Sequence, residues 1–164
     1  MLFIFGSLPG TGKTELSIHL ARKIDGVHLR IDTIEQAMRD AGIKPIGPRG
    51  YMVAYKIAAD NLRLGLPVVA DSVNPLSVTR KTWREVAIQA GVPFQEIEII
   101  CSDKDELRRR IETRQTGIAG LKLPTWKDVI EREYDVWASE HIVIDTAGQT
   151  PDESKKTLER LLRI

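Results

Sequence analysis

One short segment near the N-terminus constrains the fold of this chain more than any other. Residues 7–14 read SLPGTGKT; an apolar run at 2–5 precedes them and a helical pattern follows. A phosphate-binding loop has the form G-x-x-x-x-G-K-[ST] and lies between a strand and a helix. Ser7 replaces the first glycine of that form, with Gly6 directly before it, which is a mild departure. We therefore predict a phosphate-binding loop at this position.

The residue types in this loop suit a nucleoside triphosphate. Glycines let the backbone curl round an anion, so that N–H groups and the helix N-terminus point at the phosphates. We expect Lys13 to reach the β- and γ-phosphates and Thr14 to hold Mg²⁺. A plain glycine-rich turn is the alternative, but a lysine at a helix N-terminus is unfavourable without an anion. The residues predicted to contact the nucleotide, expected to be ATP, are Leu8, Pro9, Gly10, Thr11, Gly12, Lys13 and Thr14.

Hydrophobic patterning predicts strands and helices in alternation. Short apolar runs predict strands at residues 2–5, 27–31, 66–70, 96–100 and 141–144. Helical periodicity predicts helices at residues 15–24, 33–41, 51–64, 77–90 and 103–114, one from Thr125 to about Ser139, and one from Pro151. This alternation is typical of an α/β three-layer sandwich with a parallel sheet. We expect one domain over residues 1–164, with its ligand at the carboxyl ends of the strands.

Charge and composition argue against several classes of protein. The net charge is +1, so no bulk attraction to nucleic acid or to an anionic membrane is expected. The single cysteine, Cys101, cannot form an internal disulfide and fits a reducing compartment. No apolar run reaches the length of a membrane span, and the N-terminus lacks the basic region of a signal peptide. We expect a cytoplasmic protein whose partners are neither membranes nor nucleic acid.

Two aspartates follow predicted strands and are expected near the loop. Asp32 follows the second strand and Asp71 the third. Phosphoryl transfer to a hydroxyl uses one carboxylate that takes the acceptor proton and another acidic group near the metal. We interpret Asp32 as the base and Asp71 as the carboxylate near Mg²⁺, with the reverse assignment open. Taken singly, Asp32 fits equally well as the cap of a helix that begins at Thr33, and Asp71 as the start of a turn.

Two arginines of the charged helix at 103–114 share one face. Arg110 and Arg114 are four residues apart and precede a glycine-containing loop. Guanidinium groups can absorb charge on a transferring phosphoryl group, as we expect for Arg114, and can also stack on a base. The chain from about 110 to 124 would then form a lid over the nucleotide. The alternative is a solvated basic face on which Glu106 pairs with Arg110.

Several further residues carry weaker signals. Candidates for binding a phosphate acceptor are Arg49, Tyr51, Tyr55 and Arg80, although ordinary surface or half-buried positions explain them equally well. The three histidines show no metal-ligand spacing with Cys101 or with one another. The sequence DTAGQ at 145–149 matches a switch motif of small GTPases. It lies far from the phosphate loop, however, and the chain has no Asn-Lys-x-Asp segment for guanine, so we reject that interpretation.

Together these segments resemble the small P-loop kinases, a family that includes gluconate kinase, chloramphenicol phosphotransferase, the zeta toxins and the kinase domain of bacteriophage polynucleotide kinase. The resemblance rests on the loop at 7–14, on Asp32, on DSVNP at 71–75 and on RIETR at 110–114. It implies a five-stranded parallel sheet in the order 2-3-1-4-5 with a mobile lid. It also implies that Asp32 is the general base and that Arg114 contacts phosphate. Arg110 and the loop at 145–150 would lie near adenine.

The leading hypothesis is therefore an enzyme, a phosphotransferase that uses ATP and Mg²⁺ to phosphorylate a hydroxyl of a small-molecule acceptor. The second hypothesis is a nucleotide-binding ATPase or switch module that acts through a protein partner. Asp32 and the lid arginines argue against it, because a switch has less need of an acceptor base. A third is a toxin-like kinase of nucleotide-sugars or nucleic-acid ends, and the near-zero net charge argues against nucleic acid. The sequence leaves the acceptor and the oligomeric state open.

Overall fold

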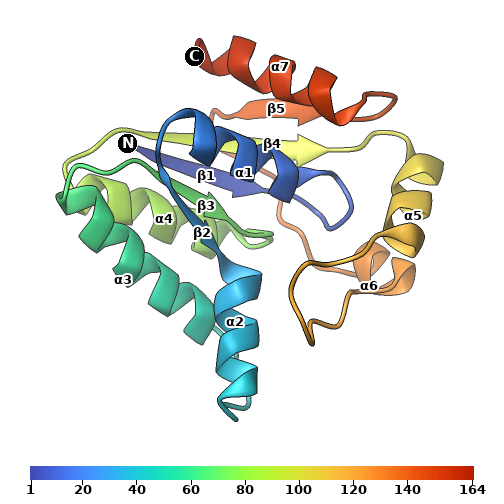
Figure 1. Cartoon of the computed structure of the whole chain (residues 1–164), viewed down its shortest axis with the longest axis horizontal. Helices are drawn as coiled ribbons and strands as arrows, with labels where there is room; N and C mark the ends of the chain where they lie inside the picture. The colour runs from blue at the N-terminus through green and yellow to red at the C-terminus, as the bar shows by residue number, and fades with distance from the viewer.

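A five-stranded parallel sheet forms the centre of the computed structural model, which describes all residues 1–164 (Figure 1). Its strands are β1 (Leu2–Gly6), β2 (Val27–Arg30), β3 (Val68–Asp71), β4 (Phe94–Ile100) and β5 (Ile142–Asp145). They lie in the order β2-β3-β1-β4-β5, and each neighbouring pair is parallel. The predicted fold class, the number of strands and their order are confirmed.

Seven helices surround the sheet and connect its strands. They are α1 (Lys13–Lys23), α2 (Ile31–Asp40), α3 (Arg49–Arg63), α4 (Ser77–Gln89), α5 (Lys104–Thr113), α6 (Trp126–Ile130) and α7 (Pro151–Leu162). Helices α3 and α4 pack on one face of the sheet and α1 and α7 on the other, which gives the three layers seen in Figure 1. No helix is both long enough and apolar enough to cross a membrane.

The side chains of β1 alternate in direction, so this one short strand contributes to the cores on both faces of the sheet. Leu2 and Ile4 point into the core shared with α3 and α4, whereas Phe3 and Phe5 point into the core shared with α1 and α7. A strand buried on both faces reads as a continuous apolar run, as this one does. Because β1 is the middle strand, the loop that follows it lies at the centre of the carboxyl edge of the sheet.

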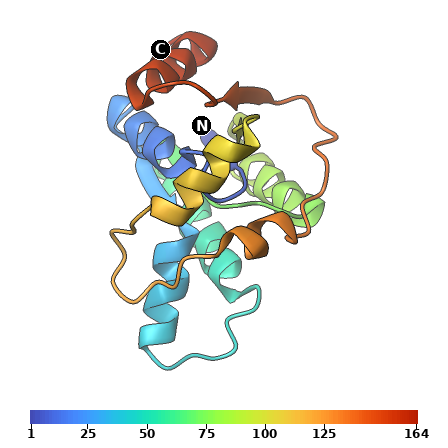
Figure 2. The same ribbon diagram turned by 90° about the vertical axis from the view of Figure 1, so that its right-hand side faces the viewer.

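Helices α5 and α6 lie beyond the carboxyl ends of the strands rather than on either face of the sheet. Figure 2 looks at this edge, and α5 crosses in front of it. The two helices share a small separate core, against which Leu8 of the phosphate loop packs. Its buried members are Cys101, Leu107, Ile111 and Val129. The loop that joins α5 to α6 reaches α2, since a Cβ at Gly120 would lie 3.1 Å from Nε2 of Gln36.

The helix predicted just before the last strand is wrong over most of its length. The sequence predicts a helix from Thr125 to about Ser139, but α6 ends at Ile130 and the chain then runs irregularly to β5. Its start is confirmed, because the Thr125 hydroxyl accepts the N–H of Asp128 while the Asp128 carboxylate accepts the N–H of Thr125.

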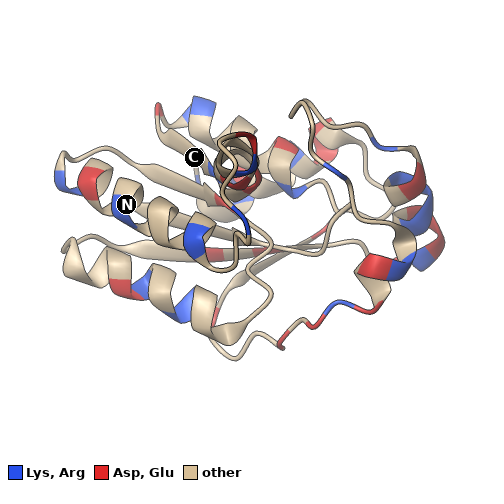
Figure 3. Ribbon diagram, turned by 90° about the horizontal axis from the view of Figure 1, so that it is seen from below, with Lys and Arg blue, Asp and Glu red and all other residues tan.

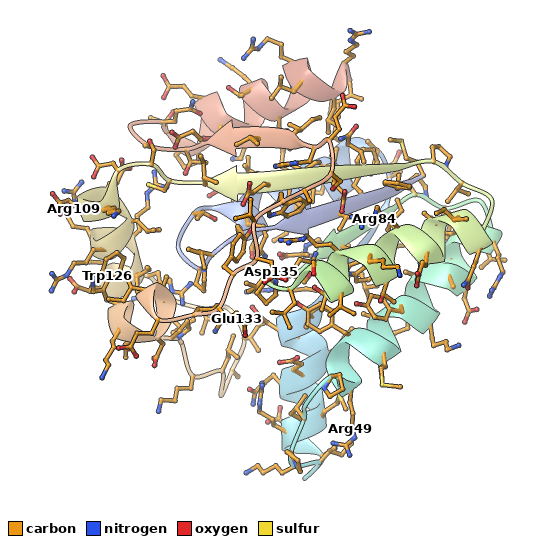
Figure 4. All side chains as sticks on the ribbon, turned by 180° about the vertical axis from the view of Figure 1, so that it is seen from behind. Arg49, Arg84, Arg109, Trp126, Glu133 and Asp135 are labelled. Atoms are coloured by element: carbon orange, nitrogen blue, oxygen red, sulfur yellow. The ribbon has the colours of Figure 1, made fainter.

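Tertiary contacts occupy the backbone groups that a longer helix would use. The carbonyls of Asp135 and Val136 accept hydrogen bonds from the guanidinium of Arg80, at 3.0 and 3.2 Å. The Asp135 N–H donates to the Pro75 carbonyl, and its carboxylate accepts the N–H of Ser77 at the start of α4 (Figure 4). A continuous helix would direct these same groups to its own turns. Tertiary bonding therefore overrides the helical period here.

Candidate nucleotide-binding site

The loop between β1 and α1 has backbone dihedrals that glycine allows. Gly10 and Gly12 have φ values of 89° and 91°, in the left-handed region that other residues rarely adopt. Gly12 is also the N-cap of α1 and supplies no side-chain acceptor. The first N–H groups of α1 thus face a position where an anion is the favoured partner. Ser7 at the first consensus position is accommodated, because it is buried and its N–H donates to the Val73 carbonyl.

Gly10 is required for a second reason, which is its contact with α5. A Cβ at Gly10 would lie 2.7 Å from Cγ1 of Ile111 and 3.1 Å from Cδ1 of Leu107. At Gly12 a Cβ would meet nothing within 4 Å, so only its φ requires glycine. The phosphate loop is therefore packed directly against the helix that carries the two predicted arginines.

Lys13 makes an ion pair with Asp71, the last residue of the neighbouring strand β3. The Asp71 carboxylate is buried, and His28 Nε2 and Arg30 Nε lie 3.4 and 3.9 Å from its Oδ2. Burial by itself raises the pKa of Asp71, but the Lys13 ammonium and the contact with His28 lower it by more, so the pKa lies well below its ordinary range. Asp71 is thus an ionised carboxylate that holds Lys13 beside the loop.

A cavity of about 920 Å³ opens over the phosphate loop at the carboxyl edge of the sheet. Its wall includes the predicted loop at 7–14 together with Asp32, Arg110 and Arg114. The connection between β5 and α7 contributes Thr146. The structure therefore brings together residues that are far apart in the sequence and were predicted to form one site. Asp71 does not line this cavity and reaches it only through its ion pair with Lys13.

Asp32 lies in the first turn of α2 rather than at the end of β2. The strand ends at Arg30, which is also the N-cap of α2, and no side chain caps this helix. The interpretation of Asp32 as the cap of a helix that begins at Thr33 is therefore wrong. Its side chain is 48% exposed, and Arg30 Nη2 lies 3.8 Å from its Oδ2. The carboxylate is available to a ligand in the cavity.

The two arginines of α5 are held differently, on a helix where basic and acidic residues are interspersed (Figure 3). Arg110 donates to the hydroxyl and carbonyl of Thr146 at 2.8 and 2.9 Å, and to Glu106 at 2.5 Å. The Glu106 pair expected for a solvated face is thus present, but Arg110 also lines the cavity. Arg114 is half-buried, and its Nε and Nη2 have no hydrogen-bond partner in the protein. An anionic ligand would satisfy these donors.

Arg80, a predicted acceptor ligand, is a structural residue instead. It is 3% exposed, does not line the cavity and bonds to the carbonyls of Asp135 and Val136. Its guanidinium carbon lies 4.6 Å from the ring centre of Trp137, which adds a cation–π contact. The prediction that Arg80 binds the acceptor is contradicted, because burial and these bonds leave its donors unavailable.

The other suggested acceptor residues also lie away from the cavity wall. The Tyr51 hydroxyl accepts the Asn74 N–H at 3.2 Å, and burial raises the pKa of Tyr51 to about 12. The Tyr55 hydroxyl donates to a backbone carbonyl of α4. Arg49 is exposed at the start of α3, far from α5 (Figure 4), and donates to the carbonyl of Pro45. None of these residues belongs to the wall of the cavity that Asp32 lines.

The cavity instead includes charged residues that the sequence patterns did not single out. Glu35 and Arg39 follow Asp32 at three- and seven-residue spacing on α2 and line the same cavity. They form an ion pair of 3.1 Å, and burial raises the pKa of Glu35. Arg30 and Arg132 complete the charged wall. The spacing on α2 was a usable signal, whereas the helical pattern predicted at 125–139 did not indicate that Arg132 would line the cavity.

A glycine-rich phosphate loop at the middle of a parallel sheet in this strand order defines a P-loop nucleotide-binding protein with the fold of the small kinases. Within that class the chain belongs to the AAA domain family, which it matches over residues 1–131.

Three solved structures illustrate the likeness of fold. A protein from Chloroflexus aurantiacus for which a kinase function has been proposed has a TM-score of 0.75 and 20% identity, over 97% of this chain and 96% of that one. The APS kinase of Mycobacterium tuberculosis, solved with AMPPNP and APS, has a TM-score of 0.70 and 18% identity, over 99% and 97%. A gluconokinase from Sinorhizobium meliloti has a TM-score of 0.65 and 17% identity, over 98% and 93%. At these identities the likeness shows the fold.

One relative differs from these in its name and its length. Peptide chain release factor 2 of Mycobacteroides abscessus is 21% identical in an alignment of 133 residues that covers 72% of this chain. The chain spans only 36% of that protein's length, so the match is to one part of it.

Proposed function

We propose that this protein is an ATP-dependent phosphotransferase that moves the γ-phosphate to a hydroxyl group of a small molecule. One observation carries the proposal: the phosphate loop, the unpaired donors of Arg114 and the half-exposed carboxylate of Asp32 line the same cavity. Phosphoryl transfer needs a cradle for the donor phosphates, a cation for the developing charge and a carboxylate for the acceptor proton. A nucleotide switch needs the cradle but not the acceptor base.

The loop residues fit the triphosphate of ATP together with Mg²⁺. Thr14 lines the cavity at the start of α1, and we propose that Thr14 and Asp71 are the protein groups nearest the ion. No group of three or more His, Cys, Asp or Glu side chains that could hold a metal comes together in the chain. Most ligands of the ion would then be phosphate oxygens and water, as is usual for Mg²⁺. When bound, Mg²⁺ would neutralise charge on the β- and γ-phosphates.

We place the adenine end of ATP beside Arg110 and Thr146. Both line the cavity, and their mutual hydrogen bonds fix the guanidinium plane against the β5–α7 connection. A fixed guanidinium offers a flat cationic surface on which a base can stack. This placement leaves the opposite side of the cavity, at Asp32, for the acceptor.

In the proposed reaction, the acceptor hydroxyl oxygen forms a bond to the γ-phosphorus. The bond between that phosphorus and the oxygen bridging to the β-phosphorus breaks, and ADP leaves with this oxygen. Asp32 takes the hydroxyl proton, while Arg114 and Lys13 stabilise the charge on the phosphoryl oxygens. Lys13 must shift part of its contact from Asp71 to the phosphates to do so.

A screen of hydroxyl-bearing metabolites for acceptor-dependent release of ADP tests this proposal. The expected result is that one chemical class of acceptor raises ADP release above the basal rate and becomes labelled from γ-labelled ATP. The Lys13→Ala variant controls for contaminating kinases. Steady ATP hydrolysis that no acceptor changes would contradict the proposal and favour a switch module.

A further inference from the structure

Three arginines meet on the side of the cavity that Asp32 occupies. Arg30 comes from the end of β2, Arg114 from the end of α5 and Arg132 from the segment after α6. Burial lowers the pKa of Arg114; Asp32 opposes this effect, and the positive charges of Arg132 and Arg30 add to it. Arg30 and Arg132 therefore both lie within electrostatic range of Arg114, although like charges repel.

The cavity as a whole is basic, in a chain whose net charge is only +1. Its basic residues are Lys13, Arg30, Arg39, Arg110, Arg114, Lys122 and Arg132, and its acidic residues are Glu15, Asp32 and Glu35. Several of these charges are already paired within the protein. Lys13 pairs with Asp71, Arg39 with Glu35 and Arg110 with Glu106. Arg30 has the carboxylates of Asp32 and Asp71 at 3.8 and 3.9 Å, so the positive charge without an ion pair lies at Arg114, Lys122 and Arg132.

Arg114 and Arg30 keep donors that the protein does not satisfy. Nε and Nη2 of Arg114 and Nε of Arg30 are buried without a hydrogen-bond partner. Arg132 also lines the cavity but is exposed, so water can solvate its guanidinium. A buried donor without a partner costs about 1–3 kcal/mol, and more when it is charged. One transferring phosphoryl group can satisfy Arg114, but it leaves Arg132 without an anion. Arg30 then has only the carboxylates of Asp32 and Asp71, at 3.8 and 3.9 Å, which are too far for a hydrogen bond.

We infer that the phosphate acceptor is itself an anion: a small alcohol that carries a carboxylate or phosphate group, held by Arg30 and Arg132 while its hydroxyl faces Asp32. The inference rests on the proposed phosphotransfer and narrows its substrate class. A neutral sugar or nucleoside would replace the water at these guanidinium groups only with hydroxyl acceptors, which bind a guanidinium more weakly than an anion does. An acceptor with an anionic group supplies bidentate acceptors for one or both of them.

Direct binding of inorganic phosphate tests the anion site without turnover. The protein is first saturated with Mg²⁺ and AMPPNP, which fills the donor side, and phosphate is then titrated by calorimetry. We expect one site, weakened about 10- to 100-fold in Arg132→Gln and in Arg30→Gln, since a charge-assisted hydrogen bond contributes about 1.5–3 kcal/mol. Arg109→Gln is the matched control, because Arg109 is exposed on α5 and does not line the cavity (Figure 4). No phosphate binding, or equal binding in all variants, would overturn the inference.

Turnover with matched acceptors distinguishes the two anionic groups. Glycerol is compared with glycerate and glycerol 3-phosphate, and ribose with ribonate and ribose 5-phosphate. We expect kcat/KM to favour an anionic member by at least about tenfold, with the acceptor KM raised and the ATP KM unchanged in Arg132→Gln. A preference for the carboxylate or for the phosphate identifies the group. Arg132 is exposed and in an irregular segment, so this variant is expected to fold even if Arg30→Gln does not.

The two proposals fail in different ways. Phosphate binding that depends on Arg30 and Arg132, without transfer to any acceptor, would contradict the phosphotransferase and leave the anion site standing. Equal use of neutral and anionic acceptors would overturn the inference and leave the phosphotransferase standing.

Discussion

The two sides of the cavity are built in different ways. The donor side is one continuous stretch of chain, from β1 through the phosphate loop into α1, and its lysine is already paired with Asp71. The acceptor side is assembled from the β2–α2 junction, the end of α5 and the segment after α6. Its guanidinium donors are left without partners in the protein. Under the proposed function, the donor side is thus prepared by backbone geometry, whereas the acceptor side would depend on the charge of its ligand.

The largest effect is expected on the donor side, from Lys13→Ala. Phosphoryl transfer should fall by about 10³-fold, because the ammonium that stabilises charge on the phosphates is lost. The variant should also be less stable by about 3 kcal/mol, since the buried carboxylate of Asp71 loses its ion pair. Turnover per folded molecule and denaturant unfolding measure the two effects.

A second substitution separates the two effects of Lys13→Ala. Adding Asp71→Asn should restore much of the stability, because no buried charge is then left unpaired, while transfer stays absent. Lys23→Ala, at the exposed end of the same helix, is the matched control. Normal turnover in Lys13→Ala would refute the donor site.

The next largest effect is expected at the acceptor side, from Asp32→Asn. Loss of the base should lower kcat by about 10²–10⁴-fold while the affinity for ATP is unchanged. Stability should change by less than about 0.5 kcal/mol, because Asp32 is half-exposed and caps no helix. Single-turnover kinetics and nucleotide titration measure these quantities, with Asp60→Asn on α3 as the exposed control. A destabilised variant with normal activity per folded molecule would show that Asp32 is structural.

Arg80→Met tests whether Arg80 is a structural residue or part of the proposed acceptor side. Loss of the hydrogen bonds to the carbonyls of Asp135 and Val136 should lower the free energy of unfolding by about 4 kcal/mol. The acceptor KM of the folded variant should equal that of the unmodified protein, because Arg80 does not line the cavity. Denaturant unfolding and steady-state kinetics decide between the two roles. A raised acceptor KM with normal stability would restore Arg80 as a ligand.

The smallest effect is the expected difference in stability between alanine substitutions at Gly10 and Gly12 of the phosphate loop. Gly12→Ala should cost about 1–2 kcal/mol, because only its positive φ disfavours a side chain. Gly10→Ala should cost about 1–3 kcal/mol more, because its Cβ would also clash with Ile111. Unfolding of the two variants in parallel gives the difference. Equal stability would mean that the loop and α5 are not packed together in solution.

The donor side could be predicted because its signals are local. A glycine-rich segment with a lysine, placed between an apolar run and a helical pattern, specifies both the loop and its place on β1. Asp32 was singled out for a similar reason, because it follows a predicted strand, and Arg110 and Arg114 because they are four residues apart on one predicted helix.

The acceptor side could not be predicted in the same way, because long-range packing decides which charges reach it. Arg80 and Arg132 are both arginines near segments of helical character, and only the fold shows that the first is buried and the second lines the cavity. The prediction of a helix that ends near Ser139 was wrong for the same physical reason. Its backbone groups bond to Arg80 and to the start of α4, and no local pattern records those partners.

The irregular segment at 131–139 has a consequence for how such proteins diverge. Arg80 holds it through the main-chain carbonyls of Asp135 and Val136, which every amino acid supplies. The side chain of Val136 is 87% exposed. The family match also ends at residue 131, where this segment begins. Side chains of the segment fix its path as well, since the Asp135 carboxylate accepts the Ser77 N–H and the Tyr134 hydroxyl donates to Glu98. Arg132 makes neither contact, so under the proposed function a substitution at position 132 can change which acceptor is bound without altering the phosphate loop.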